Sequence, residues 1–578
     1  MTEALTISLA QLNPTVGDLE GNVSLVREAR QAAAAAGADL VVAPELVVSG
    51  YPPEDLVLKP AFQDRIEALV EALAGETGDG GPAVLLGTPW RQEGLLYNAA
   101  VLLDGGKISA VGLKTDLPNY GVFDEKRVFA VGPQPKPISF RGISLGVLIC
   151  EDVWTQAPVD ALAAAGAEIL VVLNGSPFDA AKFSERVGLM VERIQGSGRP
   201  LIYVNQVGGQ DELVFDGASF VLSGDGVRKV QAPAWQSTVT TTAWQRGEGG
   251  WSCAESAIDD PPEGLEAVYQ AMVVGLRDYV DKNGFPGVVL GLSGGIDSAL
   301  SAAVAADALG SERVRCVMMP SVYTSEESLL DAGECAAMLG ARIEEIPIVP
   351  GVAALDDMLA AAFAGCQPDI AEENIQARLR GLVLMALSNK FGDMLLTTGN
   401  KSEMSVGYAT LYGDMCGGYS VLKDVYKTMV FALSQWRNQH HPAGAFGPRG
   451  RVIPERIITK PPSAELRPDQ TDQDSLPEYD ALDDILGCLI ENEMALPEIV
   501  ARGHDEATVH RIEHLLYVAE YKRRQSPPGV KITRRNFGRD RRYPITNRFR
   551  DREEGGRGLA GLCAQEPRGP EKVRRWGC

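Results

Sequence analysis

The sequence predicts two α/β domains in one chain, the second built on a doubly wound parallel sheet. The 578 residues exceed the roughly 100–200 residues typical of one domain, so at least two are expected. Short apolar runs alternate with helical stretches along most of the chain, and this alternation fails over residues 226–262. We therefore expect a first domain over 1–225, a linker over 226–262, a second domain over 263–550 and a disordered tail over 551–578.

The two halves differ in how their elements alternate. In the first half, strand-like runs at 39–43, 83–87, 143–150, 169–174 and 201–205 are separated by helical stretches, which favours a layered α/β domain. In the second half, a helix at 265–281 precedes a regular strand–helix repeat, with strands at 288–292 and 313–318 and helices at 298–309 and 328–339. That repeat is typical of a doubly wound parallel sheet.

Composition excludes several classes of protein. The 54 Lys and Arg against 77 Asp and Glu leave a formal net charge of −23 at pH 7, which repels nucleic acid and anionic lipid surfaces. We therefore expect no nucleic-acid partner. We also expect no membrane association, because no apolar stretch approaches 18 residues. The nine cysteines are scattered and contain no CxxC pair, and the first ten residues do not resemble a signal peptide. These features predict a reduced, cytoplasmic protein.

Three candidate strands of the first half end in side chains that can do chemistry. Glu45 follows the run 39–43, Lys114 follows 110–113, and Cys150 ends 145–150. If the sheet gathers these ends, Glu45 can take the thiol proton of Cys150 while Lys114 stabilises an oxyanion. Taken alone, a cysteine after apolar residues is more often an inert core thiol, and Glu or Lys at a strand end is more often a solvated cap.

The residues around these three positions resemble the nitrilase family of carbon–nitrogen hydrolases over about residues 1–225. The segments that carry the resemblance are Pro44-Glu45-Leu46, 113–120 and 149–154. It implies an αββα sandwich with Glu45 as the base, Lys114 as the oxyanion-stabilising cation and Cys150 as the thioester-forming nucleophile.

The same resemblance implies a substrate site. Tyr120, Ser176 and Lys182 match the residues that recognise glutamine. For Tyr120 and Ser176, hydrogen bonding within a loop is the alternative interpretation.

A second motif lies where a buried strand turns into a helix, at Gly291, Leu292, Ser293, Gly294, Gly295, Ile296, Asp297 and Ser298. Backbone N–H groups of such a turn converge on one point and bind an anion, although a plain strand-to-helix turn is the alternative. The lysine of the usual phosphate loop is absent, and Asp297 stands there instead, which indicates Mg²⁺ between carboxylate and phosphates. The motif resembles the pyrophosphate-loop ATPases, which transfer AMP to an acceptor.

Polar residues further along the chain suggest which acceptor is used. Asn374 and Arg378 lie on nearby turns of a predicted helix, and the strand 394–396 leads to Thr398 and then to Glu403, a second candidate acid for Mg²⁺ or ligand. The segments 373–381, 397–403, 413–418, 422–427, 460–466 and 520–525 together resemble the synthetase half of the glutamine-dependent NAD synthetase family.

The combined resemblance spans about residues 1–550 and assigns further roles. It implies ATP contacts at residues 291–298 and Thr398, and deamido-NAD contacts at Asn374, Glu403 and Lys522. Lys423, Asp424 and Asp472 are weaker correspondences that fit a structural role equally well. One departure is Glu478, which stands where the family usually has proline.

The family resemblance implies a complete reaction. The enzyme would hydrolyse glutamine to glutamate and ammonia, adenylate deamido-NAD with Mg²⁺-ATP, and amidate it to NAD, the last step of NAD biosynthesis. A shielded ammonia passage and a homo-oligomer are also expected. The rivals are a glutamine-fed ligase acting on aspartate or a purine nucleotide, and an amidase whose second half only senses a nucleotide.

Overall fold

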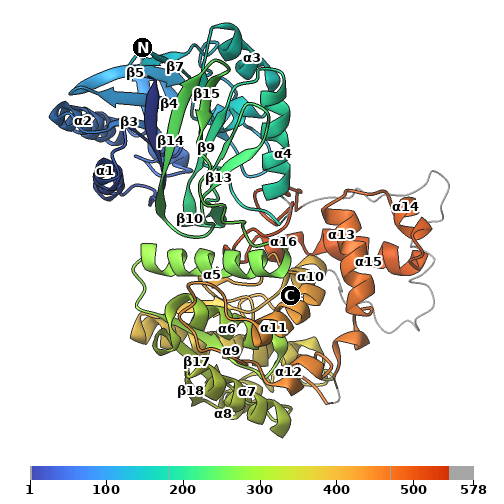
Figure 1. Cartoon of the computed structure of the whole chain (residues 1–578). Helices are drawn as coiled ribbons and strands as arrows, with labels where there is room; N and C mark the ends of the chain where they lie inside the picture. Colours follow the sequence, from blue (N-terminus) through green and yellow to red (C-terminus); the bar gives the residue numbers. More distant parts are fainter. Residues whose placement is uncertain (1–2, 181, 469, 546–578) are drawn as a thin grey trace. The chain divides into compact units, whose positions relative to one another are not determined.

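The computed structural model describes residues 3–180, 182–468 and 470–545. The chain divides into two compact units, residues 1–282 and residues 283–578 (Figure 1). The predicted disordered tail over 551–578 lies outside the described residues. Within the described residues, no helix is both long and apolar enough to cross a membrane.

The first unit contains two large facing sheets. One has the order β15-β14-β1-β2-β3-β4-β5, comprising β1 Ala4–Gln11, β2 Leu40–Val42, β3 Ala83–Gln92, β4 Leu95–Asp104, β5 Lys107–Leu113, β14 Thr238–Gly247 and β15 Gly250–Cys253. The other has the order β13-β12-β9-β8-β7-β6, comprising β6 Ile138–Phe140, β7 Ile143–Ile149, β8 Ile169–Asn174, β9 Leu201–Asn205, β12 Phe220–Leu222 and β13 Arg228–Gln231. The smaller elements are the ribbon β10 Val207–Gln210 and β11 Leu213–Asp216, and the helices α1 Leu19–Ala35, α2 Pro60–Glu76, α3 Gln156–Ala164, α4 Lys182–Gln195 and α5 Gly264–Lys282.

Alternation of side chains along the strands creates the layers of this unit. In β2, Leu40 and Val42 face the core between the sheets, whereas Val41 faces the core beneath α1 and α2. In β8, Val171 faces the inter-sheet core and Leu170 the core beneath α3 and α4. The helix pairs therefore cover opposite outer faces (Figure 1), and the predicted αββα sandwich is confirmed.

The second unit is built on one parallel sheet of order β18-β17-β16-β19-β20. Its strands are β16 Val288–Gly291, β17 Val314–Met318, β18 Arg342–Glu345, β19 Met394–Thr397 and β20 Tyr419–Ser420. Its helices are α6 Ile296–Leu309, α7 Glu326–Leu339, α8 Val349–Leu359, α9 Ile370–Phe391, α10 Lys401–Val406, α11 Lys427–Gln439, α12 Glu455–Thr459, α13 Tyr479–Ile490, α14 Leu496–Ala501, α15 Glu506–Val518 and α16 Glu520–Arg523. The strand order reverses between β16 and β19, so the predicted doubly wound sheet is confirmed. Ligands bind at such reversal points, beyond the carboxyl ends of the strands.

The predicted linker over 226–262 is wrong for most of its length. Residues 228–253 contain β13, β14 and β15, and all of β1 pairs antiparallel with residues 238–245 of β14. The threonines of β14 suggested a loop, yet Trp244 is buried and donates to the hydroxyl of Thr242, which in turn donates to the carbonyl of Ile7. Helix α5 also belongs to the first unit, where the Lys282 ammonium donates to the carbonyl of Gly209 at 2.8 Å.

Because the first unit extends to Lys282, the chain should be divisible after that residue and not after residue 225. A fragment of residues 1–225 lacks β14 and leaves β1 without its antiparallel partner, so it should give no cooperative thermal unfolding. A fragment of residues 1–282 keeps the whole unit and should unfold in one cooperative transition, measured by circular dichroism. Equal unfolding temperatures for the two fragments would show that residues 226–282 are dispensable linker after all.

Candidate active sites

The first candidate site is built around the ammonium of Lys114, which follows β5 directly. Lys114 Nζ lies 2.7 Å from Glu45 Oε1, and neither side chain is exposed. Burial lowers the pKa of Lys114, but the carboxylates of Glu125 and Glu45 outweigh it and raise this pKa well above its ordinary value. The lysine therefore stays charged inside the sandwich, as an oxyanion-stabilising cation must.

A second carboxylate completes the ion cluster, and sequence reasoning missed it. Glu125 accepts from Lys114 Nζ at 2.8 and 2.9 Å and from the hydroxyl of Tyr51 at 3.1 Å. Asn98 Nδ2 donates to Glu45 at 2.8 Å and approaches Glu125 at 3.4 Å. Burial, opposed by Lys114, raises the pKa of Glu125 to about 7. In the sequence, Glu125 lies among other charged residues, a pattern typical of a solvent-exposed loop. The sequence alone therefore gives no indication that Glu125 is part of the site.

Cys150 begins a short turn directly after β7, with a φ of 44°. The positive φ is uncommon for a residue with a side chain and marks a tight change of direction at the strand end. Burial and the charge of Glu45 raise the pKa of this thiol well above its ordinary value, although Lys114 opposes them. The resting cysteine is thus a thiol and needs a base before it can act as a nucleophile.

Asp152 ties this turn to the end of β5. One carboxylate oxygen accepts from the backbone N–H groups of Thr115 and Asp116 at 2.9 and 2.8 Å, and the other accepts from that of Ile149 at 3.0 Å. The three predicted residues do converge, but β2 and β5 belong to one sheet and β7 to the facing sheet. A carboxylate bridge therefore joins the two layers at the site.

The predicted glutamine-binding residues gather around the same cysteine. Tyr120 donates its hydroxyl to Glu151 at 3.0 Å, and the Lys182 ammonium lies 5.8 Å from the ring centres of Phe123 and Trp154. Ser176 is buried one residue after Gly175, whose N–H donates to Glu45 at 2.9 Å. These contacts place Tyr120 beside Glu151, the residue after Cys150, and Ser176 next to the ion cluster, whereas Lys182 contacts the two aromatic rings.

The second candidate site is the turn between β16 and α6. Gly294 has a φ of +79°, and a Cβ there would lie 2.3 Å from the carbonyl oxygen of Ser328, so this position requires glycine. The Ser293 and Ser298 hydroxyls hydrogen-bond each other at 3.1 Å, and Gly295 N–H donates to Ser293. These hydrogen bonds fix the backbone of the turn around Ser293.

Asp297 and Glu403 meet around one ammonium, that of Lys427. Lys427 Nζ donates to Asp297 and lies 3.4 Å from Glu403 Oε1, while Asn400 donates to Asp297 at 2.8 Å. Burial, opposed by Lys427 and reinforced by Asp297, raises the pKa of Glu403 to about 8. Two carboxylates that attract a cation beside an anion-binding turn fit Mg²⁺, which takes few protein ligands and completes its shell with phosphate and water.

Comparisons with known proteins cover both units. Residues 6–250 match the carbon-nitrogen hydrolase family and residues 268–526 the NAD synthase family. The glutamine-dependent NAD(+) synthetase of Rhodobacter capsulatus is 53% identical, over 95% of this chain and 100% of that protein. The one from Xanthomonas campestris pv. campestris (strain 8004) is 47% identical, over 94% and 98%. The solved structure of glutamine-dependent NAD+ synthetase from Acinetobacter baumannii, in complex with adenosine diphosphate, has a TM-score of 0.75 and 42% identity, over 95% and 100%.

The chain belongs to the glutamine-dependent NAD(+) synthetase family. Two of the residues that the resemblance assigned to deamido-NAD lie against the loop 407–411 of the second unit. Asn374 accepts from the hydroxyl of Thr410 at 2.9 Å, and the Lys522 ammonium donates to the carbonyls of Gly407 and Ala409 at 2.9 and 2.8 Å. Glu403 contacts Lys427 instead, on the side of the glycine turn.

The weaker correspondences separate in the structure. Asp424 is buried, pairs with Lys401 at 2.8 Å, and accepts from the backbone of Ile532 at 2.7 Å, which is a structural role. Lys423 donates to the carbonyl of Pro527 at 2.7 Å. Asp472 is buried and its charge also contributes to the raised pKa of Glu403. Sequence reasoning passed over Lys427, although it stands only three residues after Asp424.

Thr398 follows the end of β19, the strand beside β16. Because parallel strands share one carboxyl edge, Thr398 lies on the same edge as the glycine turn. This is the edge where the resemblance placed ATP.

The raised pKa of Glu403 predicts a pH-dependent stability. The folded protein holds this proton more tightly than the unfolded chain, so the stabilisation present below pH 4.5 is lost as pH rises towards 8. Glu403→Gln should therefore gain stability relative to wild type between about pH 5 and 8, by on the order of 1–4 kcal/mol. Thermal unfolding without ligands measures this, with the exposed Glu506→Gln as control. A difference that stays constant with pH would contradict the assignment.

Proposed function

We propose that this protein makes NAD from deamido-NAD, with glutamine as nitrogen donor and ATP as energy source. The observation that carries the proposal is the presence of two separate constellations in one chain. The first unit holds a thiol, a base and a cation, and the second holds an anion-binding turn beside two carboxylates.

In the first unit the base is Glu45. It takes the proton of the Cys150 thiol, and the thiolate attacks the side-chain carbonyl carbon of glutamine. The oxyanion is stabilised by Lys114, which carries its charge already in the resting site. Glu45 returns the proton to the leaving nitrogen, ammonia departs, and the glutamyl thioester remains. Glu45 then deprotonates a water molecule that hydrolyses the thioester to glutamate and restores the thiol.

In the second unit a carboxylate oxygen of deamido-NAD attacks the α-phosphorus of ATP, forming an acyl adenylate and releasing pyrophosphate. The N–H groups of residues 293–298 hold the leaving pyrophosphate, with Thr398 at the same edge. Ammonia then attacks the acyl carbon and AMP leaves, giving NAD. Asn374 and Lys522 bind deamido-NAD through the loop 407–411 that they already contact.

Asp297 and Glu403 would hold Mg²⁺ in this unit. The ion supplies positive charge that neutralises the phosphates of ATP. Lys427 holds the two carboxylates together and offsets their charge in the protein alone.

Removing the thiol should separate the two half-reactions. Cys150→Ala should lower NAD formation from glutamine by more than about 1000-fold, because it removes the sulfur on which the proposed thioester forms. Formation from ammonium chloride should stay within about twofold of wild type, because the second site is untouched. NAD is measured with deamido-NAD, ATP and Mg²⁺ present and either donor added. If wild type hydrolyses glutamine but yields NAD from neither donor, the acceptor is wrong and a purine ligase or simple amidase replaces this proposal.

A shielded passage for ammonia is part of the proposal. Ammonia is mostly protonated at neutral pH and is then not a nucleophile, so release to solvent would waste most of it. Glutamine carrying ¹⁵N in its side-chain amide should therefore label most of the NAD even in an excess of unlabelled ammonium. Labelling that falls in proportion to the unlabelled ammonium would mean that ammonia equilibrates with solvent between the two steps.

We also propose a homo-oligomer formed through α8 and α9. Leu382 and Met358 are 65% and 75% exposed on these two helices, and Met385 is one turn from Leu382. Leu382→Glu should dissociate the assembly, as measured by light scattering, without unfolding the chain. A wild-type protein that is monomeric at micromolar concentration would overturn this proposal.

The cytoplasm is the proposed location, because the seven cysteines among the described residues are all free thiols, the form kept by a reducing compartment. Cell fractionation that finds the protein elsewhere would contradict this.

A further inference from the structure

The segment that follows β8 serves the first site in two ways. Its Gly175 N–H donates to Glu45 Oε2 at 2.9 Å, which orients the base. Its next residue, Ser176, is the buried residue proposed to bind glutamine. A displacement of this one segment would therefore disturb both the base and the substrate contact, so whatever fixes its backbone matters to the reaction.

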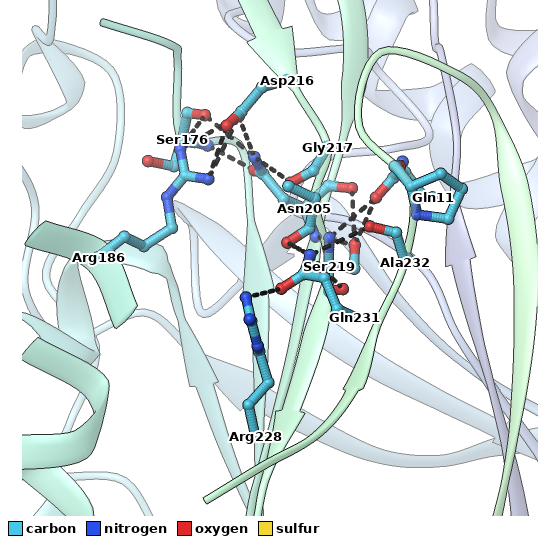
Figure 2. A network of polar contacts seen from close by, with 12 residues as sticks. Gln11, Ser176, Arg186, Asn205, Asp216, Gly217, Ser219, Arg228, Gln231 and Ala232 are labelled. Carbon is cyan, nitrogen blue, oxygen red and sulfur yellow. Dashed lines mark hydrogen bonds and ion pairs between the residues drawn. The ribbon is translucent and has the colours of Figure 1, made fainter. Parts of the chain in front are cut away.

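Asn205, the last residue of β9, fixes that backbone. Its side chain is completely buried, and Asn205 pairs with Asn174 across the parallel strands. Oδ1 of Asn205 accepts from the Ser176 N–H at 2.9 Å, and Nδ2 donates to the Ser176 carbonyl at 3.2 Å. Figure 2 shows this amide lying against Ser176. Because one rigid amide holds both backbone groups, it sets the position and the orientation of the residue.

The amide of Asn205 is held in one orientation by its other neighbours. Asp216 Oδ1 at 3.3 Å and the Gly217 carbonyl at 3.2 Å share the two hydrogens of Nδ2 with the Ser176 carbonyl, and the backbone N–H of Asn205 donates to the Ser219 hydroxyl. With acceptors on the Nδ2 side, a flipped amide would place oxygen against oxygen.

A buried ion pair helps to hold the Asn205 amide in this orientation. Arg186 and Asp216 pair at 3.2 Å with almost no exposed side-chain surface, and Arg186 also approaches the Ser176 carbonyl at 3.5 Å (Figure 2). Buried ion pairs add little net stability compared with apolar packing, because desolvation opposes the attraction. Their contribution here is to fix the geometry of the acceptor that orients Asn205.

We infer that Asn205 is a positioning residue for glutamine: it holds Ser176 in the orientation that binds the substrate. The inference deepens the proposed function and rests on it. Asn205 acts through the backbone of residues 175–176 and does not itself touch the reacting atoms.

The test is a kinetic comparison of Asn205→Ala with a matched control in the full-length protein. The control is Gln231→Ala, which removes another buried amide of the same network, one that donates to the carbonyls of Ala218, Ser219 and Ala232 and has no contact with Ser176 in the structure described. Glutamate release and NAD formation are measured against glutamine concentration, and NAD formation is measured with ammonium chloride as donor.

Asn205→Ala should raise KM for glutamine about tenfold or more, with a smaller loss in kcat, because lost hydrogen bonds weaken the substrate contact first. Its ammonium-dependent rate should equal that of wild type. Gln231→Ala should lower the unfolding temperature comparably but leave KM unchanged. An unchanged KM in Asn205→Ala, or an equal rise in both variants, would overturn the inference, because the amide would then only stabilise the sandwich.

A second variant and a second measurement test the inference if Asn205→Ala folds poorly. Asn205→Ser keeps one hydroxyl at this position and should show a smaller shift in the same direction. Protection of Cys150 by glutamine against iodoacetamide, followed by peptide mass spectrometry, reports binding without turnover and should require more glutamine in Asn205→Ser. Equal protection in wild type and variant would also overturn the inference. Failure of the proposed function is distinct, since wild type itself would then release no glutamate or make no NAD.

Discussion

The ammonium of Lys114 is the interaction on which the first site depends. It lies between Glu45 and Glu125 in the buried interior of the sandwich, where a single unpaired charge would be costly. Removing one partner of such a buried pair typically lowers the stability of the folded protein by about 3–5 kcal/mol. Replacing any one of the three charged groups alone should therefore destabilise the sandwich. Two carboxylates facing one ammonium leave excess negative charge, and the donors of Asn98, Tyr51 and Gly175 offset it. Burial, reinforced by the charge of Glu45 and opposed by Lys114, holds the pKa of the Cys150 thiol well above its ordinary value.

The second unit solves a similar electrostatic problem in a different way. Lys427 holds Asp297 and Glu403 together, but beside an anion-binding turn rather than beside a thiol. The first site keeps its ammonium charged in the resting protein, because Glu125 and Glu45 raise the pKa of Lys114 despite its burial. The second site gathers carboxylates that a divalent cation and phosphates can join. Each unit thus holds one buried ammonium that faces two carboxylates, and the two sites differ in what lies beside that cluster, a thiol in the first and a glycine turn in the second.

Sequence reasoning succeeded where a strand end carries a chemical group. Glu45, Lys114 and Cys150 each follow an apolar run, and the glycine turn sits between a buried strand and a helix, so local order predicted their neighbourhoods. It failed where function depends on tertiary contacts alone. Glu125 lies in a charged loop segment, and only the fold turns it towards Lys114. The sequence drew attention to Asp424, which has a structural role because it pairs with Lys401. It gave no sign that Lys427, three residues later, contacts Asp297.

The layered fold was predictable, whereas the boundary between the units was not. Residues 238–247 are rich in threonine and resemble a loop, but their pairing with β1 is a long-range contact that no local pattern shows. Asn205 is a similar case, because an asparagine at the end of an apolar run gives no sign that its side chain hydrogen-bonds the backbone of Ser176, in the segment after the neighbouring strand β8.

The central claim is that the Glu45–Lys114 cluster turns a resting thiol at Cys150 into a nucleophile that forms a glutamyl thioester. Rapid acid quenching of the enzyme with glutamine, followed by peptide mass spectrometry, tests this directly. The account predicts one glutamyl group on Cys150 in wild type and none in Glu45→Gln. A glutamyl group on another residue, or the same amount of adduct on Cys150 without the carboxylate of Glu45, would contradict it.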